Sequence, residues 1–256
     1  MNQDWDNLII LDACRYDLFR DIGAPQLPGT LDKFQSRGTH TGEFMKQNFT
    51  EVDHKDIVYV SSNPNPAEVD ARFFDVISVW DNGWDDDLHT VPPEEMTEAT
   101  ITASKDYPNK RIITHYLQPH YPFIGEIGEQ FHEKYGYTEL SEPDHMWLKM
   151  RRGEVSKEKA WNAYEENLEV VLSYVKKSLE ELSGKTVVTS DHGNAFGEYG
   201  IYGHPPRAYI PSLENVPWFE VEYDTRKQVI EGESSVTTKD DSADIEERLA
   251  DLGYLE

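Results

Sequence analysis

Thr186-Val187-Val188-Thr189-Ser190-Asp191-His192-Gly193 is the stretch of sequence that decides the fold. Its apolar run predicts a buried strand, and the polar residues after it lie where that strand opens into a loop. In α/β proteins, ligands bind at this carboxyl end of the sheet. Asp191 and His192 offer an oxygen and a nitrogen donor to a divalent metal, although an Asp-His pair in a loop is also typical of a solvated turn.

A second acidic strand end lies near the N-terminus, in Leu8-Ile9-Ile10-Leu11-Asp12. Four apolar residues without alternation predict a strand that is buried on both faces, as in a parallel sheet. Asp12 follows that strand directly, although it is also consistent with the N-cap of the short helix predicted over residues 16–22. Two strand-end aspartates, one of them followed by a histidine, favour a metal centre.

The other predicted elements alternate along the chain, which indicates an α/β fold with a mostly parallel sheet. Residues 156–183 carry apolar side chains at steps of three and four, the spacing of one helical face, and Pro92-Pro93-Glu94-Glu95 is typical of a helix N-terminus. We expect a polar loop over residues 232–242 and a short closing helix over residues 243–252. The remaining strands are predicted over residues 57–60, 76–79, 111–116 and 216–221.

Several motifs together resemble those of the alkaline phosphatase and sulfatase superfamily. The first is Ser190-Asp191-His192-Gly193-Asn194-Ala195-Phe196-Gly197 with the following Tyr202-Gly203-His204-Pro205, and the second is His115-Tyr116-Leu117-Gln118-Pro119-His120-Tyr121-Pro122-Phe123. The chain is most similar to soluble sulfatase-like proteins of halophilic archaea. The resemblance implies an alkaline-phosphatase-like domain over residues 1–256, with helices flanking the central sheet.

The resemblance also implies a metal centre and a nucleophile at a helix N-terminus, where free backbone amides bind phosphate or sulfate oxygens. We expect Asp12, Thr41, Asp191 and His192 to hold a divalent ion (Zn, Mn, Mg or Ca), with one or two ions in all. Thr41 is the predicted nucleophile, and Thr39 is the second candidate. A metal-bound threonine could attack phosphorus because coordination lowers the pKa of its hydroxyl. Both threonines are also typical helix caps. Residues 31–38 resemble the helix and glycine that precede this element.

Three further side chains are candidates for contacts with the substrate. His120 and His204 would protonate the leaving group, contact the substrate or hold a second metal, unless the neighbouring prolines simply fix them in rigid loops. Arg15 would hold a phosphoryl oxygen or pair with Asp17 instead. His115 lies within a predicted strand, and we interpret it as structural.

The chain has no Cys-x-Pro-Ser-Arg motif, which true sulfatases convert to formylglycine, and its single cysteine, Cys14, is interpreted as a small buried side chain. We therefore predict a metal-dependent hydrolase or transferase that acts on phosphate-type esters through a threonine. The alternatives are a sulfate-ester hydrolase of the same superfamily and a non-catalytic binding module. The substrate would be a small-molecule, glycan-linked or lipid-linked phosphate or sulfate ester.

The net charge and the hydropathy of the chain indicate what kind of protein this is and where it is located. The 256 residues carry a formal net charge of −25, which favours a halophilic protein over an acidic mesophilic enzyme and argues against a nucleic-acid ligand. The aromatic content argues against disorder. No apolar run approaches the roughly 20 residues of a membrane span, and the chain enters its first strand too early for a signal peptide. We therefore expect a cytoplasmic protein, and the sequence leaves its oligomeric state open.

Overall fold

β1 (Asn7–Leu11) lies in the interior of the main sheet and is buried along its whole length. The computed structural model describes residues 3–64, 69–138, 144–233 and 236–237. Within them, the main sheet has the strand order β10-β4-β3-β5-β1-β6-β9-β2. β4, β3, β5, β1 and β6 run parallel, whereas β9, β2 and β10 join through antiparallel pairs. The predicted mostly parallel α/β sheet is therefore confirmed.

The strands of this sheet are β1, β2 (Gly29–Gln35), β3 (Asp53–Ser61), β4 (Arg72–Ser78), β5 (Arg111–Tyr116), β6 (Thr186–Thr189), β9 (Asn215–Val221) and β10 (Val236–Thr237), and β7 (Ala195–Phe196) pairs separately with β8 (Tyr202–Gly203). The helices are α1 (Tyr16–Leu18), α2 (Thr41–Phe49), α3 (Val79–Asn82), α4 (Pro93–Asp106), α5 (Glu126–Tyr135), α6 (Met146–Arg151), α7 (Lys157–Glu181) and α8 (Pro211–Glu214). Single helical turns are η1 (Phe19–Gly23), η2 (Ala24–Gln26) and η4 (Glu198–Gly200).

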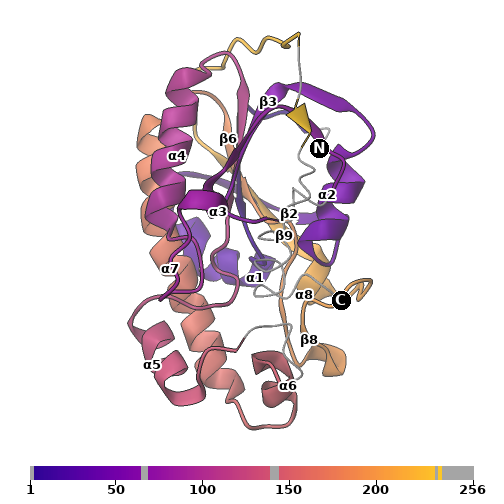
Figure 1. Cartoon of the computed structure of the whole chain (residues 1–256), viewed down its shortest axis with the longest axis vertical. Helices are drawn as coiled ribbons and strands as arrows, with labels where there is room; N and C mark the ends of the chain where they lie inside the picture. Colours follow the sequence, from indigo (N-terminus) through magenta and orange to yellow (C-terminus); the bar gives the residue numbers. More distant parts are fainter. Residues whose placement is uncertain (1–2, 65–68, 139–143, 234–235, 238–256) are drawn as a thin grey trace.

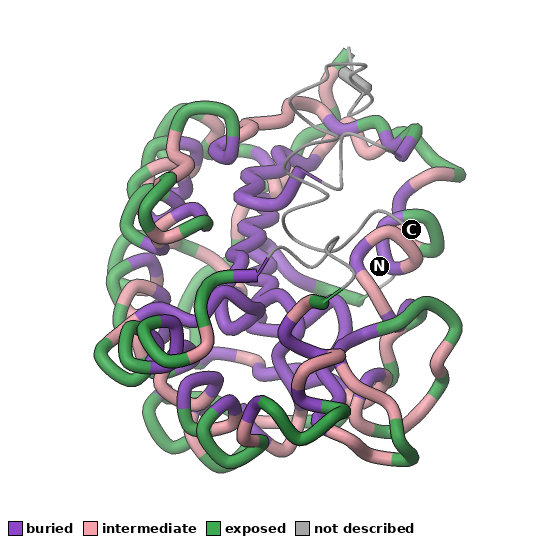
Figure 2. The backbone as a smooth tube through the Cα atoms, turned by 60° about the horizontal axis from the view of Figure 1, so that its bottom comes forward, coloured by how far each residue is buried: buried purple, intermediate pink, exposed green. Residues whose placement is uncertain are grey.

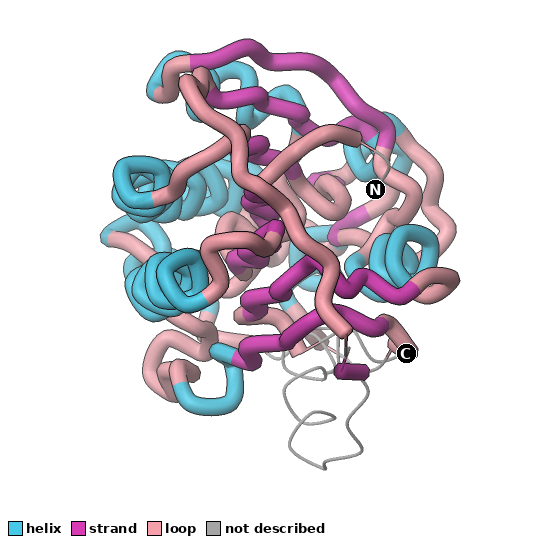
Figure 3. Tube along the Cα trace, turned by 90° about the horizontal axis from the view of Figure 1, so that it is seen from above, coloured by secondary structure: helices cyan, strands magenta, loops and turns pink. Residues whose placement is uncertain are grey.

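Helices cover both faces of the sheet, which explains why β1 is apolar without alternation. Ile9 and Leu11 belong to a buried cluster that includes residues of α4 and α7, whereas Leu8 and Ile10 belong to a second cluster that includes residues of α2. α4 and α7 lie on one side of the strands and α2 on the other (Figure 1), and a view from above shows the same layers (Figure 3). Most of the buried part of the chain lies in the middle of the molecule, with exposed segments around it (Figure 2).

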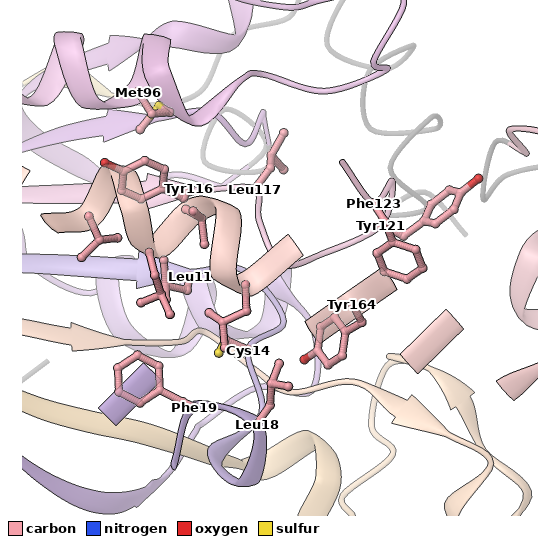
Figure 4. Packing of buried hydrophobic residues seen from close by; sticks show 14 of the residues in the cluster. Leu11, Cys14, Leu18, Phe19, Met96, Tyr116, Leu117, Tyr121, Phe123 and Tyr164 are labelled. Atoms are coloured by element: carbon pink, nitrogen blue, oxygen red, sulfur yellow. The ribbon is translucent and has the colours of Figure 1, made fainter. Parts of the chain in front are cut away.

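α7 provides the largest helical contribution to the first cluster. Ser156 caps its N-terminus, where the Ser156 Oγ accepts a hydrogen bond from Lys159 N. The predicted stripe is buried at Tyr164, Leu168 and Val171 among others, and each such side chain stabilises the fold by roughly 1.5–3 kcal/mol. Figure 4 shows the end of this cluster nearest the carboxyl ends of the strands, where Tyr164 lies close to Cys14. Cys14 is buried, as the sequence predicts.

The predicted helix over residues 31–38 is wrong, because residues 29–35 form β2 along the edge of the sheet. β2 pairs in register with β9 over its full length, and most of its side chains are exposed. β2 includes charged residues, which an edge strand tolerates because one of its two long edges faces water. Within the predicted loop over residues 232–242, residues 236–237 form β10 instead. The predicted closing helix over residues 243–252 lies outside the described residues.

α5 and α6 are among the helices that the sequence analysis did not predict, and α5 packs against α7. His132 of α5 is buried, its Nε2 lies 3.1 Å from the Phe123 carbonyl oxygen, and its ring stacks on Tyr137 at 3.8 Å. Burial lowers the pKa of His132 to about 4. Among the described residues, none of the helices has the length and apolar composition that crossing a membrane requires.

This buried histidine predicts a loss of stability in acid. Below pH 6.5 the unfolded chain binds a proton at His132, whereas the native state stays neutral down to about pH 4, so the contribution of His132 is present above pH 6.5 and is lost as the pH falls towards 4. His132→Phe should lower the free energy of unfolding at pH 7.5 but reduce its decline between pH 6.5 and 5 by up to about 1.4 kcal/mol per pH unit. Urea unfolding at several pH values measures this, and an unchanged slope would contradict it.

Candidate metal centre

The candidate centre lies where β1 and β6 end, side by side in the sheet. β1 and β6 pair in parallel, with Ile10 opposite Thr189, so Asp12 and Asp191 leave the same edge of the sheet. Ala13 takes a left-handed conformation with a φ of 58°, which turns its backbone N–H towards Asp191 Oδ1 at 3.1 Å. The two loops are also tied by Cys14 N, which donates to Ser190 Oγ at 2.9 Å.

Asp12, Asp191 and His192 bring three potential ligand atoms within 4.8 Å of one another, and all three residues are buried. His192 Nε2 lies 3.5 Å from Asp12 Oδ1 and 3.3 Å from Asp191 Oδ2. A metal bound at about 2.0–2.2 Å from each atom sets neighbouring ligands roughly 3–3.6 Å apart. The spacing of these atoms therefore fits one divalent ion.

Thr41 completes the set that the sequence predicts. It is the first residue of α2 and is buried. Its Oγ1 donates to Asp191 Oδ2 at 2.6 Å and lies 3.4 Å from His192 Nε2. Thr39 is not part of this group, because its Oγ1 lies 3.1 Å from both Glu43 Oε2 and the Pro205 carbonyl oxygen. Of the two candidate nucleophiles, Thr41 is the one that the fold brings to the carboxylate and imidazole.

The charge on Asp191 also fits a cation. Burial raises the pKa of this carboxyl, but the neighbouring His192 and His115 and the hydrogen bonds from Thr41 and Ala13 outweigh that effect, so its pKa lies below the ordinary value. Among the described residues, no lysine or arginine forms an ion pair with Asp191. A buried carboxylate is costly without a compensating positive charge, and a divalent ion would supply it.

His120 and His204 lie beside this group, from two loops far apart in sequence. Their Nε2 atoms are 2.8 Å apart, and the His204 ring centroid is 4.7 Å from that of His192. Burial lowers the pKa of His120 to about 3 and that of His204 well below its ordinary value, and His192 adds to both shifts. The pair is therefore neutral at pH 7, with one ring donating a hydrogen bond to the other.

Arg15 pairs with Asp17, which is the alternative that the sequence leaves open. Its guanidinium forms bonds of 2.8 and 2.6 Å with the Asp17 carboxylate and one of 2.7 Å with Glu198 Oε1. It also lies over the Trp161 ring, with the guanidinium carbon 5.0 Å from the ring centroid. A contact between Arg15 and a substrate stays a prediction.

Two residues at this centre were missed by the sequence analysis. Asn63 follows β3, and its Nδ2 donates to Asp12 Oδ2 at 2.6 Å. His115, which we interpreted as structural, has its Nε2 3.7 Å from Asp12 Oδ2 and 3.9 Å from Asp191 Oδ2, and its Nδ1 lies 2.8 Å from the Tyr59 hydroxyl. Asn63 carries the same strand-end signal as Asp12. His115 gives no such signal, because it lies within β5.

No protein-family model matches the chain, and no curated protein matches it. Solved structures do. The chain is similar to the soluble domain of lipooligosaccharide phosphoethanolamine transferase A from Neisseria meningitidis, with 17% identity, a TM-score of 0.53, and coverage of 83% of this chain and 75% of that one. It is also similar to the C-terminal periplasmic domain of EptC from Escherichia coli in complex with Zn, with 14% identity, a TM-score of 0.56, and coverage of 85% and 72%.

A third neighbour is a putative sulfatase from Bacteroides thetaiotaomicron, with 10% identity, a TM-score of 0.53, and coverage of 87% of this chain and 65% of that one. The chain has an alkaline-phosphatase-like fold. Its structural neighbours are proteins of the alkaline phosphatase and sulfatase superfamily, as the motifs suggested. The comparisons give no support to the expected halophilic archaeal type.

The donor set predicts that divalent metal binding depends on Asp191. Protein purified in concentrated salt without a chelator should carry about one equivalent of metal, and Asp191→Ala should lose it because a carboxylate ligand is gone. Elemental analysis measures the content. Asp56→Asn is the control, since Asp56 pairs with Arg111, the first residue of β5, at the end of the strands opposite the centre.

Retention of the metal by Asp191→Ala would refute the assigned centre. Two equivalents in the wild-type protein, one of them lost in His204→Ala, would place a second ion at the His120–His204 pair.

Proposed function

We propose that the chain is a metal-dependent hydrolase or transferase that acts on phosphate-type esters, with Thr41 as the nucleophile. The observation that carries the proposal is the position of the Thr41 hydroxyl, 2.6 Å from Asp191 Oδ2 and 3.4 Å from His192 Nε2 at the start of α2. Positioned side chains of this kind activate a nucleophile that is weak at its free pKa.

A divalent ion held by Asp12, Asp191 and His192 would supply a Lewis acid that lowers the pKa of the Thr41 hydroxyl and offsets charge on a phosphoryl oxygen. The Asp191 carboxylate orients the hydroxyl by accepting its hydrogen bond. The backbone amides of the first turn of α2 favour negative charge nearby. Together these groups hold the oxygen that would attack phosphorus.

The reaction would proceed in two steps. Thr41 Oγ1 gives up its proton to solvent and bonds to phosphorus, while the bond from phosphorus to the departing alcohol breaks and that alcohol takes up a proton. Water or an acceptor alcohol then loses a proton and bonds to phosphorus, the bond from phosphorus to Thr41 Oγ1 breaks, and Oγ1 takes up a proton. The outcome is hydrolysis with water and transfer with another alcohol.

His120 and His204 would carry the proton to the departing alcohol. Both are neutral in the free protein because of burial, and an anionic ester beside them would favour their protonated form by Coulomb attraction. The 2.8 Å separation between their Nε2 atoms lets a proton pass between the rings.

Two considerations favour phosphate over sulfate esters. The chain lacks the formylglycine motif, and its only cysteine is buried. One of the neighbours is the soluble domain of a phosphoethanolamine transferase. A sulfate-ester hydrolase and a non-catalytic binding module remain the alternatives.

The name of the meningococcal neighbour refers to lipooligosaccharide, so a lipid-linked or glycan-linked ester is the substrate class that we propose. Cytoplasmic location stays a prediction, whereas the neighbour EptC from Escherichia coli is a periplasmic domain.

Thr41→Ala should lower the hydrolysis of p-nitrophenyl phosphate or bis(p-nitrophenyl) phosphate by about a thousandfold or more, because the attacking oxygen is removed. Thr41→Ser should retain part of the activity. Thr50→Ala, at the opposite end of α2, is the matched control. Mass spectrometry of acid-quenched enzyme should find the phosphoryl group on the peptide that contains Thr41.

Full activity of Thr41→Ala would refute the mechanism. A comparable loss in Thr39→Val, with phosphate found on Thr39, would move the nucleophile to that residue. Faster hydrolysis of p-nitrophenyl sulfate than of either phosphate would favour the sulfatase alternative. No turnover of any of these esters by metal-loaded protein would favour the binding module.

A further inference from the structure

Glu43 joins two segments of the chain, one that carries the proposed nucleophile Thr41 and one that carries His204. Glu43 lies in the first turn of α2. Its Oε2 accepts hydrogen bonds from Thr39 N at 3.0 Å and from Thr39 Oγ1 at 3.1 Å. Its Oε1 accepts from Arg207 N at 3.2 Å. The first two bonds hold the loop that enters α2, and the third reaches a segment 164 residues further along the chain.

The segment at Arg207 also carries His204. The Pro205 carbonyl oxygen lies 3.1 Å from Thr39 Oγ1, so the single hydroxyl proton of Thr39 is shared between Pro205 and Glu43. Thr41 is two residues before Glu43 in the same helical turn. Residues 204–207 are thus fastened to the start of α2 by side-chain bonds at both Pro205 and Arg207.

These contacts exceed what a helix cap requires. A glutamate at the third position of a helix commonly accepts a backbone N–H from the cap region, and such a bond is local. One carboxylate oxygen of Glu43 accepts the local bonds, and the other accepts a hydrogen bond from Arg207 N. Arg207 has a φ of 59°, a conformation that is costly for a residue with a Cβ, and the bond to Glu43 helps to hold it there.

We propose that Glu43 is a positioning residue that sets the placement of His204 relative to Thr41. The proposal rests on the function proposed above, in which Thr41 attacks and the His120–His204 pair carries the proton. Glu43 itself need not touch the substrate. Because misplacement of reacting groups by about 1 Å can cost a hundredfold in rate, loss of this link would slow the chemical step.

The test compares Glu43→Ala and Glu43→Gln with the wild-type protein, all metal-loaded and of full length. Glu98→Ala is the matched control, because Glu98 is an exposed glutamate on a different helix, α4. On the better of the two p-nitrophenyl phosphate esters, Glu43→Ala should lower kcat about tenfold or more with little change in KM. Glu43→Gln keeps one oxygen acceptor and should fall between the wild type and Glu43→Ala.

A second readout does not depend on activity. Trypsin cleavage after Arg207, followed by mass spectrometry of the fragments, measures how readily residues 204–207 leave α2. Glu43→Ala should be cut there about tenfold faster than the wild type and the Glu98→Ala control. If Glu43→Ala does not fold, Glu43→Gln supplies both comparisons.

Unchanged cleavage and unchanged kcat in both Glu43 variants would overturn the proposal. Faster cleavage with unchanged kcat would also overturn it, because Glu43 would then tie the segment without serving the reaction. A wild-type protein that turns over none of the esters would refute the proposed function, and the cleavage rates would still decide whether Glu43 holds residues 204–207.

Discussion

The meeting of two buried carboxylates, Asp12 and Asp191, is the constraint on which the rest of the structure depends. Negative charges that lie this close in a dry interior repel each other, and they persist only where hydrogen bonds and positive charge compensate for the lost water. The fold supplies hydrogen bonds from Asn63 to Asp12 and from Ala13 and Thr41 to Asp191. The negative charge that these hydrogen bonds leave uncompensated fits a divalent cation. The chemistry proposed for the centre follows from this need for positive charge.

The sheet explains how this meeting is achieved. Strands covered by helices on both faces are fixed in register by apolar packing, so the ends of β1 and β6 present their side chains at defined positions. The loops beyond them have no such support, and they are held by bonds to one another, as between Cys14 N and Ser190 Oγ. Glu43 extends the same principle outward, because it ties residues 204–207 to the start of α2.

The neighbours show how different two sequences can be while the folds remain similar. Identities of 10–17% accompany TM-scores of 0.53–0.56 in the three structures compared. A sheet of this kind requires apolar side chains of suitable size on both faces, and many sequences satisfy that requirement. The short polar motifs at the strand ends indicated the fold class before the structure did.

The sequence by itself predicted the parallel sheet, the long helix α7 and Asp12, Asp191 and His192 as candidate metal ligands, because apolar periodicity and strand-end polar residues are local signals. That these three residues lie together was decided by the tertiary structure. Its error over residues 31–38 arose because strand or helix there is decided by pairing with β9, which is distant in sequence. Only the tertiary structure decided that Thr41 rather than Thr39 faces Asp191, and that His115 reaches the carboxylates from within β5. These outcomes depend on contacts between segments 76 to 150 residues apart, which no local pattern encodes.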